Sequence, residues 1–191
     1  MGITSSNQGA IQTPEITVDR FIAATIAGDA NRMGELIGLN PARGKPLDQA
    51  LGTILGPEIE QYWRGQAQNP ADYRWETKEQ GRSEQSANVE VDLFSPDYGA
   101  IAHRTSELLG FTTDQAGMLT APDEPTMDVE EAEHLAREDP QTEPLHYRLT
   151  LHVINQDNQW ILDPEDPATS ALVAVIRRGD LLETNEEYLI R

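Results

Sequence analysis

Four histidines are the side chains of this 191-residue chain best suited to proton transfer near neutral pH. His146 and His152 share one face of an extended stretch, but they are too far apart to chelate one metal ion without a third ligand from elsewhere. His103 precedes Glu107 by four residues, and a carboxylate at that spacing on a helix could poise the imidazole as a general base. His134 stands among glutamates and is most simply a solvated residue. His103, His146 and His152 are equally explained as exposed surface residues with no catalytic role.

The sequence lacks the short motifs that mark common catalytic and cofactor sites. It contains no P-loop, no Gly-x-Gly-x-x-Gly, no Gly-x-Ser-x-Gly and no His-Glu-x-x-His. The absence of cysteine also excludes disulfides, zinc–thiolate sites and thiol nucleophiles. The sequence therefore predicts no metal, no cofactor and a binding role in preference to catalysis.

Aromatic side chains offer the clearest candidates for a binding pocket, because ligand sites are mostly apolar and aromatic. The candidate pocket-lining residues are Trp63, Tyr73, Trp75, Tyr147 and Trp160. An ordinary core anchor is the simpler interpretation of Trp160. Trp63, which follows another aromatic residue just before a Gly-Gln stretch, is harder to explain as core.

The chain has 33 acidic and 14 basic side chains, and its formal net charge is −19. Such acidity argues against binding nucleic-acid phosphates and favours cations or a basic protein partner. Acids are densest between 123 and 143, where nine stand against Arg137 alone. This segment lacks EF-hand spacing, so it predicts a partner or cation surface or simply a solvated acidic segment. The candidate surface residues are Asp123, Glu124, Asp128, Glu130 and Glu131.

A β-hairpin between 144 and 163 is the element with the clearest pattern. Apolar and polar residues alternate from 145 to 153, residues 155–158 have turn chemistry, and Trp160 opens a short returning strand. Shorter alternating runs at 73–78 and 87–94, joined by a polar turn around Gly81-Arg82-Ser83, predict two more strands. Four antiparallel strands are enough for a stable sheet.

Helices are expected before the sheet. Thr13-Pro14 has the chemistry of a helix start, and Asp29 can cap a second helix after Gly28. A third helix is expected from Asp48. The predicted fold class is therefore α+β, with N-terminal helices packed on a curved antiparallel sheet.

Other segments complete the predicted organisation of the chain. Residues 1–12 read as a disordered linker and 13–191 as a single domain. Residues 95–143 are too long for an ordinary loop and predict an acidic insertion, with helices at 98–111 and 129–137 around an irregular stretch. Residues 171–179 could form a helix or a strand, and 186–190 could add a last short strand.

Two of these segments resemble the NTF2-like superfamily. Residues 18–29, an apolar helix running into Gly28-Asp29, resemble its opening helices, and residues 147–163 resemble its closing hairpin. The resemblance implies a cone-shaped sheet wrapped on helices with a pocket between them. It carries no catalytic residues, because the superfamily contains both enzymes and binding proteins.

The resemblance is strongest to small cell-envelope lipoproteins of bacteria. These are anchored through an N-terminal cysteine that follows a signal peptide, and a chain beginning beyond that cysteine would lack it, as this one does. The expected location is therefore extracytoplasmic, with a cytoplasmic one as the alternative, and any membrane contact would be through that anchor. The expected partner is a small apolar ligand or a protein.

Three functions remain open at this point. The first is a non-catalytic extracytoplasmic binding domain that uses the cone pocket or the acidic insertion. The second is an NTF2-like isomerase or hydrolase with a carboxylate or histidine inside the cone. That hypothesis requires at least one of six side chains to point inward: Glu76, Glu90, Asp92, His146, Arg148 and His152. The third is an acidic inhibitor or immunity-type protein that masks a basic partner.

Overall fold

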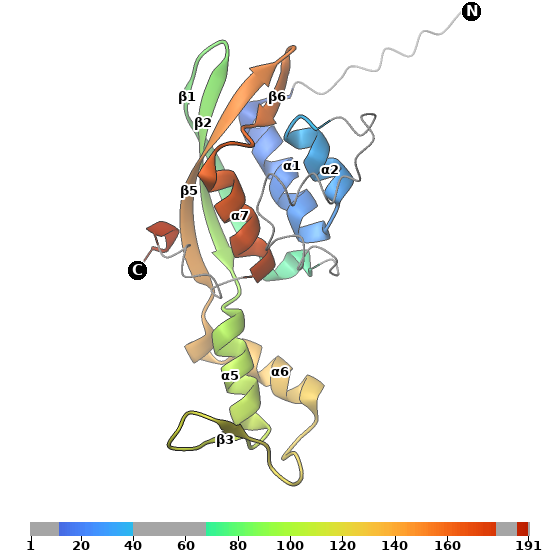
Figure 1. Cartoon of the computed structure of the whole chain (residues 1–191), viewed down its shortest axis with the longest axis vertical. Coiled ribbons are helices and arrows are strands. Elements are labelled where there is room, and N and C mark those ends of the chain that lie inside the picture. Colours follow the sequence, from blue (N-terminus) through green and yellow to red (C-terminus); the bar gives the residue numbers. More distant parts are fainter. Residues whose placement is uncertain (1–11, 40–67, 179–186, 191) are drawn as a thin grey trace, which may run out of the picture.

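A computed structural model describes residues 12–39, 68–178 and 187–190 of the chain. Within these residues the fold is α+β, with five α-helices and a curved antiparallel sheet of four strands (Figure 1). The helices are α1 (Pro14–Ala27), α2 (Ala30–Leu36), α5 (Tyr98–Leu108), α6 (Val129–Glu138) and α7 (Pro167–Arg178). The sheet strands are β1 (Arg74–Arg82), β2 (Ser86–Ser95), β5 (Leu145–Gln156) and β6 (Gln159–Leu162). The predicted helix from Asp48, and the predicted linker apart from Gln12, lie outside the described residues.

The sheet has the order β1-β2-β5-β6, and each neighbouring pair is antiparallel. The predicted hairpin is confirmed as β5 and β6. Its turn is tighter than predicted, since positions 155 and 156 still belong to the strand ladder. Asp157 and Asn158 alone form the turn, with φ of 53° and 63°. Two positive φ values are what a two-residue hairpin of matching twist requires.

The hairpin of β1 and β2 is also longer than the alternating runs predicted. The turn expected around Gly81-Arg82-Ser83 begins later than predicted, because β1 continues to Arg82 after a register shift between Glu79 and Gly81. The reversal lies at 83–85, where the Ser83 N–H donates to the Ser86 carbonyl at 2.7 Å. A β-bulge absorbs the extra residue without ending the strand.

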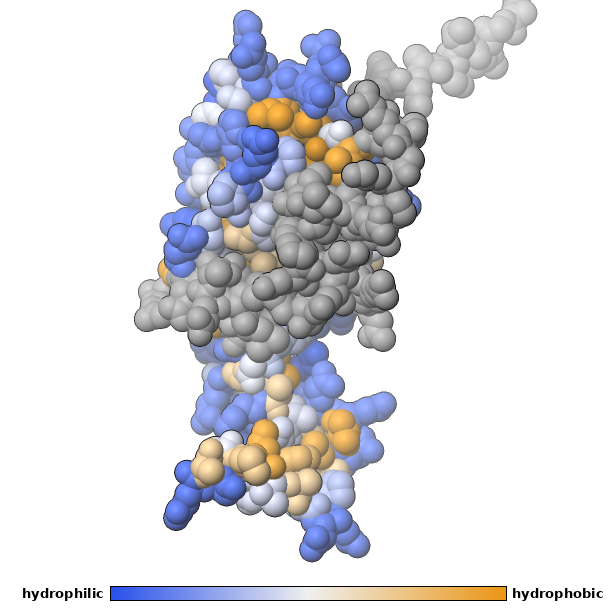
Figure 2. All heavy atoms as spheres, in the orientation of Figure 1, coloured by the Kyte–Doolittle hydropathy of each residue, from blue (hydrophilic) through white to orange (hydrophobic). Residues whose placement is uncertain are grey.

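Residues 97–142, which we call the arm, separate β2 from β5 and lie beyond the end of the sheet (Figure 1). The predicted helices of this segment are confirmed as α5 and α6. Between them, the stretch expected to be irregular contains a small hairpin of β3 (Thr112–Thr113) and β4 (Leu119–Thr120). The remainder of the described chain, which we call the body, contains the sheet. Hydrophilic residues cover much of both parts (Figure 2).

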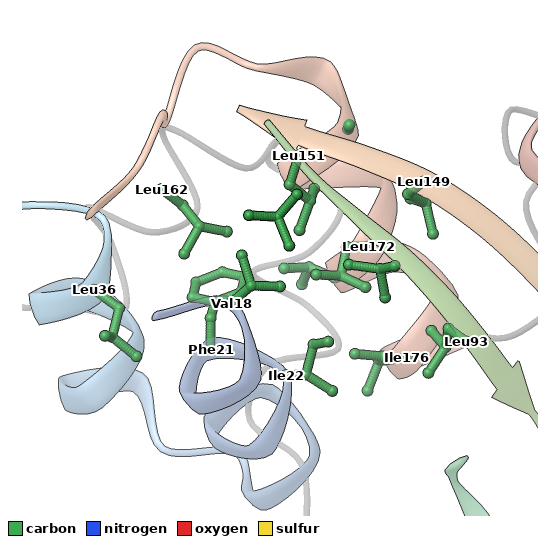
Figure 3. Packing of buried hydrophobic residues seen from close by; sticks show 14 of the residues in the cluster. Val18, Phe21, Ile22, Leu36, Leu93, Leu149, Leu151, Leu162, Leu172 and Ile176 are labelled. Carbon is green, nitrogen blue, oxygen red and sulfur yellow. The ribbon is translucent and has the colours of Figure 1, made fainter. Parts of the chain in front are cut away.

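The core lies between one face of the sheet and helices α1 and α7 (Figure 3). Val18, Phe21 and Ile22 of α1 are fully buried, as are Leu151 of β5 and Leu172 of α7. The Thr13 hydroxyl accepts from the Ile16 N–H at the start of α1. Gly28 ends this helix in the left-handed region, and Asp29 caps α2 as predicted.

Helix α7 settles the alternative that the sequence left open after the hairpin. Its run of β-branched residues is buried, with Val173, Val175 and Ile176 each 0% exposed. A strand would place alternate residues on opposite faces. The helix instead turns this run toward α1 and β5, both of which it contacts. Residues 187–190 add only one β-bridge, between Leu189 and Tyr147, in place of the predicted last strand.

Candidate binding surfaces

The four described aromatic candidates lie at separate positions. Tyr147 and Trp160 are core residues, 2% and 9% exposed. Tyr73 is also buried, and its hydroxyl donates to the Ile176 carbonyl at 2.9 Å and hydrogen-bonds the Tyr98 hydroxyl. Burial, with a smaller contribution from Tyr98, raises the pKa of Tyr73 well above its ordinary value. The remaining candidate, Trp63, lies outside the described residues.

Trp75 is half-buried and lines a groove between α1 and β1. The groove has a volume of about 700 Å³ but is wide open to solvent. The Trp75 indole N–H and the Thr77 hydroxyl both donate to the Asp19 carboxylate, at 3.2 and 3.1 Å. These bonds fix the edge strand to α1. The polar side chains of the groove therefore join β1 to α1, and they do not indicate a ligand site.

None of the six candidate acid–base residues points into the core. Their neighbours in β2 and β5, such as Val89, Val91 and Leu149, are buried against the helices. Because side chains alternate along a strand, the candidates lie on the outer face. The six outer-face residues are Glu76, Glu90, Asp92, His146, Arg148 and His152. The arrangement does not supply the inward-facing group that the enzyme hypothesis requires.

Asp92, His146 and Arg148 form a polar cluster on that outer face. His146 Nε2 lies 2.6 Å from Asp92 Oδ1, and Arg148 makes two bonds to the same carboxylate at 3.0 and 3.2 Å. The His146 ring stacks on the Phe94 ring, with centroids 4.3 Å apart. The Arg74 guanidinium lies 4.2 Å from the centroid of the Phe94 ring. These are cross-strand pairs of β1, β2 and β5. We assign the cluster to the stability of the sheet.

Replacing Asp92 with asparagine should remove one source of acid sensitivity. Partial burial acts to raise the pKa of Asp92, but hydrogen bonds from His146 and Arg148 prevail and hold that pKa below its ordinary value. Asp92 therefore stabilises the fold above its unfolded pKa of about 3.9. This contribution is lost as the pH falls through the lower pKa of the folded state.

Urea unfolding measured between pH 7 and pH 3 tests this linkage. The wild-type midpoint should fall more steeply below pH 4 than that of Asp92→Asn. Glu84→Gln, which changes an exposed carboxylate in the turn between β1 and β2, serves as the control. Identical pH profiles for wild type and Asp92→Asn would show that ionisation of Asp92 contributes nothing to the stability of the fold.

The five acidic candidates all lie exposed on the arm. Asp128 also caps α6, where its carboxylate accepts from the Glu130 N–H at 2.8 Å. Among the described residues, no group of three or more Asp, Glu or His side chains is arranged to hold a metal ion.

The exposure of apolar side chains on the arm is the feature that sequence reasoning missed. Met118 and Leu119 are 68% and 62% exposed, Val129 is 57% exposed and Leu135 is 42% exposed. Hydrophobic residues gather over the far end of the arm, with hydrophilic residues around them (Figure 2). The only available signal was an adjacent Met-Leu pair inside a polar, glycine-containing stretch. Exposed apolar clusters with a polar rim are typical of interaction sites.

A cleft of about 380 Å³ lies between α5 and the β3–β4 hairpin. Gly110, at φ 89°, reverses the chain after α5, and the Phe111 N–H donates back to the Ser106 carbonyl at 2.9 Å. Asp114 then closes the small hairpin by accepting from the Met118 N–H at 2.8 Å. The reversal brings Phe111 and Leu119 opposite one face of α5. That face contributes Ala102, His103, Ser106 and Glu107.

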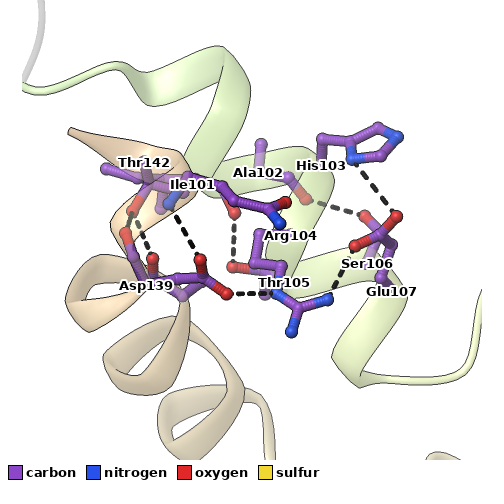
Figure 4. A network of polar contacts seen from close by, with 11 residues as sticks. Ile101, Ala102, His103, Arg104, Thr105, Ser106, Glu107, Asp139 and Thr142 are labelled. Carbon is purple, nitrogen blue, oxygen red and sulfur yellow. Dashed lines mark hydrogen bonds and ion pairs between the residues drawn. The ribbon is translucent and has the colours of Figure 1, made fainter.

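The arm is fixed by ion pairs at both of its helices. Arg104 Nε of α5 lies 2.7 Å from Asp139 Oδ2, just after α6, and Arg104 Nη1 lies 2.9 Å from Glu107 Oε2 (Figure 4). Arg137 of α6 pairs with Asp72 of the body at 3.2 Å. The pairs join α5 to α6 and the arm to the body.

No described helix has both the length and the apolar character needed to cross a membrane. Comparison of the chain with protein-family models, with curated proteins and with solved structures found no significant match.

Proposed function

We propose that this chain is a non-catalytic binding domain whose arm binds a protein with a basic surface. The observation that carries the proposal is the exposure of apolar side chains, Met118 and Leu119 above all, within a strongly acidic surface. Residues 95–143 contain 12 carboxylates against Arg104 and Arg137. The acids steer a basic partner toward the arm, and the apolar side chains supply affinity once water is expelled.

Charge narrows the class of partner. A surface this acidic repels nucleic acid and anionic membranes. It also repels a second copy of the same arm. A cationic protein surface is therefore the partner that fits both the charge and the apolar side chains.

The proposal includes an NTF2-like body with the arm as an insertion. Two helices that precede a curved antiparallel sheet and cover one of its faces support that architecture, as does the closing hairpin. An extracytoplasmic location rests on the resemblance alone. An inhibitor that masks a basic partner would use the same exposed acids of α6, and it is the second candidate function.

The test compares two variants that remove equal charge from different surfaces. The arm variant carries Glu124→Gln, Glu130→Gln and Glu131→Gln, and the control carries Glu76→Gln, Glu84→Gln and Glu90→Gln in the β1–β2 hairpin. Immobilised wild-type chain and the control should capture the same basic protein from an extract of the source cells. The arm variant should lose it.

Salt provides a second condition for the same capture experiment. At about 0.5 M salt, where exposed charges are largely screened, capture by the wild type should weaken. Equal capture by the arm variant and the control would contradict the proposal. If the captured protein has an activity, its loss on binding would distinguish an inhibitor from a simple binding domain.

A further inference from the structure

The arm cleft has the volume of a small binding pocket. Its volume of about 380 Å³ lies at the lower end of the roughly 300–1,000 Å³ typical of ligand sites. The half-buried Phe111 ring and the exposed Leu119 side chain supply its apolar surface, opposite Ala102. Apolar groups this accessible gain stability when a partner's apolar side chain covers them.

The rim of the cleft carries a carboxylate held in place by the arm itself. Arg104 Nη1 donates to Glu107 Oε2, and Arg104 Nε donates to Asp139 Oδ2 (Figure 4). Glu107 Oε1 lies 3.7 Å from His103 Nδ1, beyond hydrogen-bond distance. The Ser106 hydroxyl donates within α5, to the Ala102 carbonyl at 2.9 Å. Glu107 is thus the carboxylate of a cleft whose lining otherwise combines apolar side chains with His103, Ser106 and Thr113.

Apolar surface continues beyond the cleft. Met118 lies next to Leu119 and is 68% exposed. A small molecule held in the cleft would leave that side chain uncovered. A polypeptide segment can cover the cleft and Met118 together, while its cationic side chains face the acids of the arm.

We propose that this cleft receives an apolar side chain from a segment of the partner that also carries lysine or arginine. The apolar side chain lies between Phe111 and Leu119, and a neighbouring cationic group pairs with Glu107. This assignment rests on the proposed function. It adds the chemistry of the partner's segment and the place on the arm where that segment binds.

A labelled amphipathic peptide of lysine and leucine is the probe, with its lysine–serine analogue as the matched peptide. Fluorescence anisotropy should show that the leucine peptide binds the full chain more tightly than the serine analogue. Two substitutions, Ser106→Trp, which fills the cleft, and Leu119→Ser, should each lower the affinity for the leucine peptide by about tenfold or more. Ile190→Ser removes an exposed apolar side chain outside the arm and should leave affinity nearly unchanged.

Amide NMR shifts give a measurement that does not depend on any variant. Addition of the leucine peptide to the wild-type chain should shift the amides of Ser106, Phe111 and Leu119 and spare those of α1. Circular dichroism confirms that each variant remains folded.

The outcomes separate the two proposals. If Ser106→Trp and Leu119→Ser bind as wild type while the arm's Glu→Gln variant binds more weakly, the cleft assignment is wrong and the acidic surface stands. If the Glu→Gln variant also binds as wild type, both proposals are wrong. Equal affinity for the leucine and serine peptides would likewise overturn the cleft.

Discussion

Replacing Phe21 with alanine is expected to lower the free energy of unfolding by about 3–5 kcal/mol. The Phe21 ring is 0% exposed and lies in the core shared by α1, the sheet and α7 (Figure 3). The loss combines the transfer free energy of the ring with the cavity that it leaves. Elements held from several sides cannot all move in to fill that cavity. Urea unfolding of the two proteins measures the difference.

Phe94→Ala is the matched control for this prediction. It removes the same atoms from the outer face of the sheet, where Phe94 is half-buried between His146 and Arg74. Its cost should be about 1 kcal/mol, the magnitude of exposed stacking and cation–π contacts. Equal losses for the two variants would mean that Phe21 is no more deeply buried than Phe94 and does not belong to the core.

Leu172→Ala should cost about 2–5 kcal/mol, because it empties a buried position on the face of α7 that meets the sheet and α1. This prediction tests the helix that the sequence could not distinguish from a strand. The matched control is Leu135→Ala on α6, where the same change removes a side chain that is 42% exposed. The control should stay within about 1 kcal/mol of wild type.

Thermal or urea unfolding of both leucine variants gives the comparison directly. Protection of the α7 amides from hydrogen exchange provides an independent readout, because buried helices open only in large unfolding events. A Leu172→Ala protein as stable as Leu135→Ala would show that residues 167–178 do not belong to the core.

The patterns with short range in the sequence predicted their elements well. Alternation from Leu145 to Val153 predicted β5, and the capping residues Thr13 and Asp29 predicted where two helices begin. These signals work because hydrogen bonds and side-chain spacing within a few residues determine them. The two turns were placed less accurately, because the bulge before Gly81 and the two-residue turn at Asp157 depend on strand pairing.

The candidate site, in contrast, was predicted poorly from the sequence. Tyr147, selected as pocket lining, is part of the core, and so is Trp160, for which a core anchor was already the simpler interpretation. The acidic arm was recognised from charge alone, but the cleft at Phe111 and Leu119 was not. Its two apolar sides are eight residues apart, and they face α5 only because the chain reverses at Gly110.

By itself the sequence determined the α+β class, the strong acidity, the helix starts and the main hairpin, since each follows from local spacing or from a sum over residues. Only the tertiary structure decided three further points. It folded the β-branched run of α7 as a helix, because that helix buries Val173, Val175 and Ile176 between α1 and β5. It turned the acid–base candidates outward, because one face of the sheet had to cover the core. It formed the arm cleft, because contacts between distant residues have no signature in local sequence.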